Sequence, residues 1–143
     1  MSDAIRVLNI AGISPVRKEG TDRSEMVTQM LLGESGMVLE MTDHWLHIRL
    51  DLDGYEGWVN RNEMRFMPES DWHVWASMPK FRNRYASMII QGKTRPFFVP
   101  LGALLGKTPD GSLSVGREIL EPVIHDEAVI EHPLHYAQTL LGT

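Results

Sequence analysis

The segment Trp45–Val59, WLHIRLDLDGYEGWV, carries the clearest structural pattern in the 143-residue chain. Leu46, Ile48 and Leu50 fall on one side of an extended chain, and the residues between them fall on the other. This period of two predicts a half-buried strand. Asp53-Gly54 then predicts a hairpin turn, because glycine accepts a positive φ without a Cβ penalty. A second strand is expected from Tyr55 to Val59.

Further short strands are expected around this hairpin. Residues 5–10 predict a first strand, which Ser14-Pro15 is expected to end, and residues 17–24 predict a long exposed loop. Two apolar runs, 26–32 and 37–39, flank a glycine-bearing turn and favour strands. Residues 60–64 predict a short helical turn. About five closely spaced strands indicate a small barrel or sandwich.

The second half of the chain has a weaker pattern. Residues 68–79 predict a connection with about one helical turn, and strands are expected at 85–91, 94–99, 112–115 and 118–123, with turns between them. Residues 131–142 are the one convincing helix, because Leu134, Ala137, Gln138 and Leu141 recur at helical spacing.

Composition excludes several classes of protein. The chain has 14 basic and 19 acidic residues, a net charge of −5, which argues against a nucleic-acid partner. The basic residues from 61 to 84 are interleaved with acids and apolar residues and are expected on a solvated face: Arg61, Arg65, Lys80, Arg82 and Arg84. No apolar run reaches eighteen residues, so no membrane span is expected.

Cysteine and the N-terminus bear on chemistry and compartment. The chain has no cysteine, which excludes disulfides, thiolate metal sites and a cysteine nucleophile within it. The start, MSDAIRVLNIAG, lacks the basic and apolar regions of a signal peptide. The chain as given is therefore expected to be cytoplasmic, or periplasmic or exported if a leader was removed.

Residue patterns give no sign of independent catalysis or of a cofactor. His44 and His47 would face opposite ways on a strand, and the histidines after residue 124 match no recognisable zinc set. No serine lies in a G-x-S-x-G elbow, and no glycine-rich segment fits a phosphate-binding loop. We expect no catalytic residue, no metal and no cofactor in this chain.

Three segments together resemble a known family: SEMVTQMLLGE at 24–34, the hairpin at 45–59, and LHYAQTLLGT at 134–143. In this order they resemble the N-terminal region of NlpC-type cysteine peptidases of the γ-D-glutamyl-L-diamino acid endopeptidase kind, also called dipeptidyl-peptidase VI. The resemblance implies a mainly β chain of two small SH3-like β-barrels in tandem (bacterial SH3, or SH3b, domains). It assigns residues 1–67 to the first, 68–123 to the second, and 124–143 to a linker and the start of a catalytic-domain helix.

The resemblance also implies partners and a substrate. A papain-like catalytic domain would follow in the same chain, with its cysteine and histidine beyond Thr143, so that the chain ends within the first catalytic-domain helix. The substrate would be a muropeptide, L-Ala-γ-D-Glu-diamino acid, released during recycling of cell-wall peptidoglycan. The tandem SH3-like region would shape the cleft of that hydrolase and select the free N-terminal L-Ala.

Two substrate-binding residues follow from the resemblance. Tyr55 matches the family tyrosine at the GYEGW hairpin, and Glu25 in SEM matches best the acidic residue that receives the substrate amine. From the residues alone, Tyr55 is also an ordinary strand aromatic, and Glu25 is also an ordinary loop carboxylate. The residue patterns leave both interpretations open.

Two other functions fit the same residues. One is a stand-alone module that binds cell wall or peptide without a catalytic domain, for which Trp45, Trp58, Trp72 and Trp75 could form a stacking surface. Core packing is the expected role of these tryptophans instead. The other is a protein-interaction domain that uses an exposed helix from Glu131 onward.

Overall fold

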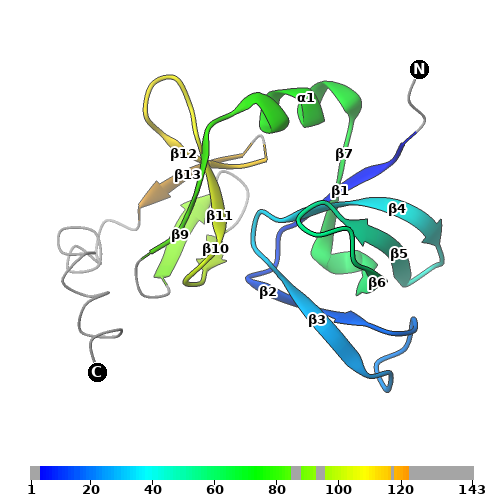
Figure 1. The fold of residues 1–143 in the computed structure, drawn as a ribbon. Helices are drawn as coiled ribbons and strands as arrows, with labels where there is room; N and C mark the ends of the chain where they lie inside the picture. Colours follow the sequence, from blue (N-terminus) through cyan, green and yellow to red (C-terminus); the bar gives the residue numbers. More distant parts are fainter. Residues whose placement is uncertain (1–3, 85–87, 93–95, 117, 123–143) are drawn as a thin grey trace.

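A computed structural model describes residues 4–84, 88–92, 96–116 and 118–122. Over these residues the chain is mainly β, with two sheets and one α-helix, α1 (Figure 1). The mainly β class expected from the sequence is confirmed. The helix expected at 131–142 lies outside the described residues.

The first sheet contains seven strands in the order β3-β2-β6-β5-β4-β1-β7. All register pairs within it are antiparallel, as expected for strands joined by short turns. Its strands are β1 (Arg6–Asn9), β2 (Ile13–Arg17), β3 (Met26–Leu31), β4 (Ser35–Met41), β5 (Trp45–Leu50), β6 (Glu56–Asn60) and β7 (Met64–Met67). A 3₁₀ turn, η1 (Arg61–Glu63), separates the last two.

The second sheet contains six strands in the order β10-β9-β13-β12-β11-β8. Its strands are β8 (Lys80–Arg82), β9 (Met88–Gly92), β10 (Pro96–Val99), β11 (Leu104–Lys107), β12 (Leu113–Val115) and β13 (Glu118–Pro122). Within the described ranges, neither strand order returns to its starting strand, so closure of each sheet into a barrel stays a prediction.

The hairpin at 45–59 folds as expected. β5 pairs with β6, with Trp45 opposite Asn60 at one end and Arg49 opposite Glu56 at the other. Gly54 has φ +76° in the turn. The alternating residues of β5 lie in a core of the first sheet, to which β1, β2, β3, β6 and β7 also contribute apolar side chains. This core contains Val7, Val16, Met30, Leu46, Ile48, Leu50, Val59 and Met64.

The prediction that Ser14-Pro15 ends the first pattern is wrong, because β2 runs through both residues. Pro15 pairs with Gln29 of β3, while the register with β6 on the other side contains Arg17 alone. A strand with an open side accepts proline, which has no backbone N–H to donate.

The connection at 68–79 is a nine-residue helix, α1 (Glu69–Ser77), rather than the single turn expected. Glu69 and Asp71 lie in its first turn, where negative charge favours the helix dipole. Its periodicity is weak, but Trp75 is 1% exposed and anchors it to the core. Tertiary packing therefore stabilises a helix that the sequence pattern does not reveal.

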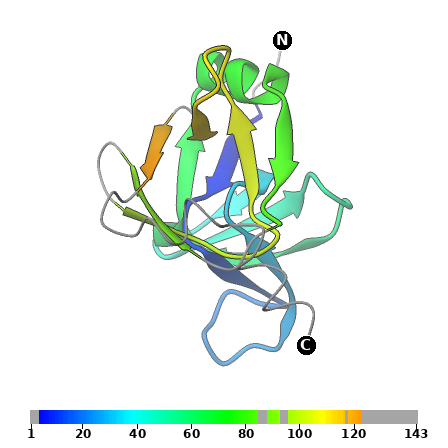
Figure 2. The ribbon, with the colours of Figure 1, turned by 90° about the vertical axis from the view of Figure 1, so that its left-hand side faces the viewer.

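Strands β8 and β11 are not among the strands expected from the sequence. Each is short, and β11 contains Gly106, whose missing side chain makes room for the Trp75 ring and the Met78 sulfur of the α1 end. In both views α1 crosses above these two strands (Figure 1, Figure 2). Gly106 interrupts the apolar pattern of β11 in the sequence. The same residue lets α1 pack closely against β11.

The C-terminal end of α1 has no basic residue of its own, and Lys80 supplies one. Its Nζ donates to the carbonyl oxygens of Trp75 at 2.6 Å, Met78 at 3.0 Å and Ala76 at 3.3 Å, and lies 5.0 Å from the Trp75 ring centre. A cation here satisfies carbonyls that a helix end leaves without partners. Burial lowers the pKa of Lys80 below its ordinary value.

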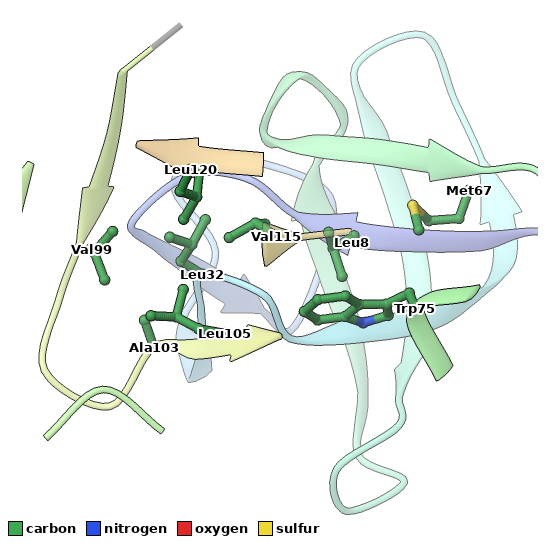
Figure 3. Packing of buried hydrophobic residues seen from close by; sticks show 9 residues of the cluster. All are labelled: Leu8, Leu32, Met67, Trp75, Val99, Ala103, Leu105, Val115 and Leu120. Atoms are coloured by element: carbon green, nitrogen blue, oxygen red, sulfur yellow. The ribbon is translucent and has the colours of Figure 1, made fainter. Parts of the chain in front are cut away.

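A second core joins the two sheets. Leu8, Leu32 and Met67 come from the first sheet and its turn, Trp75 comes from α1, and the remaining members come from the second half (Figure 3). Those members are Val99, Ala103, Leu105, Val115 and Leu120. The two halves therefore bury apolar surface in common, which opposes their separation.

The backbones of the two halves also meet at Gly33. The Leu104 N–H donates to the Leu32 carbonyl at 2.8 Å, and a Cβ added to Gly33 would lie 1.8 Å from the Leu104 carbonyl oxygen. Gly33 also has φ +88°, a conformation that side chains disfavour. Glycine is required here both for the turn and for the contact between the halves.

Replacing Gly33 with alanine is expected to lower the free energy of unfolding by more than about 2 kcal/mol. The left-handed backbone alone costs roughly 1–2 kcal/mol, and the clash with Leu104 adds to it. Gly111→Ala is the matched control, because Gly111 has φ +89° with nothing within 4 Å of an added Cβ. Urea unfolding followed by circular dichroism would measure both changes. Equal losses for the two variants would show that the contact with Leu104 contributes nothing.

Candidate functional site

Tyr55 lies directly before β6, the second strand of the hairpin, and its backbone is held by two hydrogen bonds. Its N–H donates to Asp53 Oδ1 at 3.0 Å, and its carbonyl accepts from the Leu50 N–H at 2.8 Å. The Asp53 contact is an Asx turn, which stabilises the tight bend. The Tyr55 side chain is 46% exposed, so it does not pack into the core of the first sheet. It is available to a ligand at this end of the sheet.

Glu25 lies at the end of the exposed loop that precedes β3. Its side chain is exposed, and its carbonyl accepts from the Lys18 N–H at 2.9 Å. Ser24 closes the loop, because its Oγ accepts from the Glu19 N–H and its carbonyl accepts from Arg17 Nη1 at 3.0 Å. The exposed loop expected at 17–24 lies at 18–25, because Arg17 still belongs to β2, and these bonds hold Glu25 at a defined position.

The strand order relates the two predicted residues. Arg17 of β2 lies opposite Met26 of β3 on one side and opposite Trp58 of β6 on the other, so these three residues form one row across the sheet. Glu25 and Tyr55 both precede this row, so they lie at the same end of the sheet, two strand positions apart. The exposed Lys18 lies between them on the continuation of β2.

The four tryptophans do not share one surface. Trp72 and Trp75 are on α1, where Trp75 is in the shared core and the Arg6 guanidinium lies 4.6 Å from the Trp72 ring centre. Trp45 and Trp58 flank Gly20 on the outer face of the first sheet. Packing, rather than a common stacking surface, therefore accounts for Trp72 and Trp75.

The outer face also holds a stacked pair. The His47 and Trp58 rings lie 4.9 Å apart between centres at an interplanar angle of 13°, and Glu40 Oε2 lies 3.6 Å from His47 Nδ1. His47 therefore has an aromatic and a carboxylate neighbour. Within the part of the chain that the structure describes, no three histidine or carboxylate side chains gather as metal ligands would.

A pocket of about 280 Å³ lies where α1, β8 and the β3–β4 turn meet, and no sequence pattern indicates it. Glu34 there accepts from Arg82 Nη1 at 2.7 Å and from the Leu31 N–H at 2.9 Å, and its side chain is only 11% exposed. A second ion pair also joins the two halves: Arg65 pairs with the nearly buried Glu118 at 3.1 Å.

The prediction of a solvated basic face is thus wrong for Arg65 and Arg82, because each forms an ion pair between the two halves.

Comparison with known proteins identifies one matching segment. Residues 16–63, less than half of the chain, match the family described as the bacterial dipeptidyl-peptidase Sh3 domain. A comparison with curated protein sequences gives no match. Within the described residues, no helix is long and apolar enough to cross a membrane.

A comparison with solved structures gives a match to the structure of NlpC2 from Trichomonas vaginalis. The two share 11% sequence identity with a TM-score of 0.38, over 83% of this chain and 45% of the other. This chain therefore spans less than half the length of that protein. Residues 16–63, which include both Glu25 and Tyr55, are similar to a bacterial SH3 domain.

Arg82→Met is expected to lower the free energy of unfolding by about 1–3 kcal/mol, because it leaves the nearly buried Glu34 carboxylate without its cation. Arg49→Met is the matched control. Its partner Glu56, at 3.2 Å, is 45% exposed, and such a pair contributes about 0–1 kcal/mol. Thermal unfolding of both variants would measure the difference. A smaller loss for Arg82→Met than for Arg49→Met would contradict a structural role for the junction pair.

Proposed function

We propose that this chain is the non-catalytic SH3b region of an NlpC-type cysteine peptidase that acts on peptidoglycan peptides. The observation that carries the proposal is the match of residues 16–63 to the SH3 domain of bacterial dipeptidyl-peptidases. The mainly β fold of both halves supports it. The catalytic partner would be a papain-like domain in the same polypeptide, as the three segments of the sequence resemblance imply.

The finer proposal is that Tyr55 and Glu25 bind the free N-terminal L-Ala of a muropeptide, L-Ala-γ-D-Glu-diamino acid. A primary amine is cationic at neutral pH, so its site requires a carboxylate and a further acceptor. Glu25 would supply the first and the Tyr55 hydroxyl the second. The exposure of both side chains and their position at one end of the first sheet support this pairing.

Selection for a short peptide follows from the same arrangement. The Asx turn at Asp53 fixes the backbone of Tyr55, and the bonds of Ser24 fix the loop before Glu25. A rigid wall of this kind closes one end of a cleft and excludes a peptide that continues past its amine. Muropeptides still joined to glycan would be rejected, which suits a hydrolase of cell-wall recycling.

The domain boundaries belong to the same proposal. Residues 1–67 would form the first SH3-like barrel, residues 68–123 the second, and residues 124–143 the linker and the start of a catalytic-domain helix. The two separate strand orders support two units. The shared core and the junction ion pairs would hold these units at a fixed orientation toward the catalytic domain.

Tyr55→Phe and Glu25→Gln are each expected to raise KM for a tripeptide with a free amine by at least about 10-fold, the loss of one charge-assisted hydrogen bond. The assay uses the polypeptide in which this chain continues into a catalytic domain. An N-acetylated tripeptide is cleaved poorly by all forms. Glu19→Gln, another exposed carboxylate of the same loop, is the control and leaves KM unchanged. Unchanged KM in both site variants would contradict the assignment.

Titration calorimetry of this 143-residue chain with L-Ala-γ-D-Glu-diaminopimelate separates the proposal from its alternative. A region that forms only one wall of the site is expected to release little or no heat, because the remaining contacts come from the catalytic domain. A stand-alone cell-wall or peptide-binding module would give a saturable signal without any further domain. Saturation that Tyr55→Phe abolishes would favour the stand-alone module.

A further inference from the structure

Among the residues that the structure describes, β8 is an edge strand of the second sheet. It pairs with β11 on one side, with Arg82 opposite Leu104, and the strand order stops there. An edge strand presents backbone N–H and C=O groups to whatever lies beside it. The edge of β8 is therefore a template for one more strand.

The direction of the backbone groups identifies the residue that faces this edge. The Asn83 N–H donates inward to the Ala103 carbonyl at 2.7 Å, whereas the Leu104 N–H donates to Leu32 and not across to Arg82. In an antiparallel pair, bonded and non-bonded positions alternate. The N–H and C=O of Arg82 therefore point away from β11, toward the open edge.

A pocket of about 620 Å³ lies against β8. The described residues that line it are Lys80, Phe81, Arg82, Arg84 and Leu104. Successive side chains of a strand point to opposite faces, and Arg82 and its partner Leu104 are both among the lining residues. The pocket therefore lies against β8 and reaches its paired strand β11, next to the edge at which a strand could be added.

The charge of the pocket is opposite to that of the whole chain. Among the described residues that line it, Lys80, Arg82 and Arg84 are cations, although the chain has a net charge of −5. The hydrogen bonds of Arg82 to Glu34 and to the Gly102 carbonyl, the latter at 3.1 Å, both use Nη1. They fix a planar guanidinium whose Nε and Nη2 edge has the geometry to bind a carboxylate with two hydrogen bonds. Arg84 adds an exposed cation beside it.

Apolar surface completes the pocket. Phe81 is 40% exposed, and Leu104 on the paired strand β11 is half-buried. A ligand that alternates acidic and apolar side chains would place carboxylates near the arginines and apolar groups near Phe81. An extended peptide has this alternation, because its side chains change face at every residue.

We propose that the open edge of β8 binds an acidic extended peptide, which adds to the second sheet as a strand through the backbone of Arg82. Strand addition obtains its affinity from main-chain hydrogen bonds and its specificity from side-chain pockets. The cations of β8 repel a second copy of the same edge and attract an acidic partner. This site lies on the second sheet, whereas Glu25 and Tyr55 flank strands of the first, and it does not depend on the proposed function.

The direct test uses a fluorescein-labelled hexapeptide, Glu-Val-Glu-Val-Glu-Val, and fluorescence anisotropy with the full 143-residue chain. Saturable binding is expected, and the corresponding Lys-Val peptide should bind at least about 10-fold more weakly. Arg84→Glu should weaken binding of the acidic peptide at least about 10-fold. Arg23→Glu makes the same change of charge in the exposed loop before Glu25 and should change binding less than about 2-fold.

Hydrogen exchange tests the mode of binding. Exchange at the Arg82 amide should slow at least about 10-fold when the acidic peptide is added, because this N–H would gain a partner. The Phe81 amide, which faces β11, should change little and serves as the internal control. Equal effects of the two charge reversals, no saturable binding, or an Arg82 amide that exchanges equally fast with and without peptide would each overturn the proposal.

Discussion

The tightest constraint at the junction of the two halves is the close contact between the Gly33 turn and the β11 backbone. The contact brings the Leu32 carbonyl to the Leu104 N–H and leaves no room for a side chain at Gly33. Beside this contact, Leu8, Leu32 and Leu105 pack in one core with Trp75. The burial of apolar surface then stabilises an orientation that the backbone contact defines.

Charge reinforces this junction at two separate places. Arg82 binds Glu34 on one side, and Arg65 binds Glu118 on another, with both carboxylates largely buried. A nearly buried carboxylate is costly to leave without a partner, so each pair opposes separation of the halves more than an exposed pair would. Lys80 performs a similar task locally, since it satisfies the carbonyl end of α1. Arg65 and Arg82 thus form ion pairs at the junction, and Lys80 caps the end of α1.

The two candidate binding regions use the sheets in different ways. Tyr55 and Glu25 lie where turns leave one end of the first sheet, so the turns determine their positions. The β8 region lies along a strand edge of the second sheet, where backbone groups as well as side chains can bind. A rigid junction would allow both regions to present fixed surfaces to other parts of a larger protein.

Local sequence patterns were sufficient to predict the strands with regular alternation and clear turn residues. The β5–β6 hairpin, the exposed loop before β3 and the mainly β class follow from local periodicity and from Asp53-Gly54. In contrast, α1, β8 and β11 depend on packing between distant segments, because Trp75 and Gly106 acquire their roles from residues far away in the chain. Local patterns report which side of an element is buried. They do not report which distant segment packs against that side. The Glu34–Arg82 ion pair and the edge position of β8 both depend on how distant segments pack together.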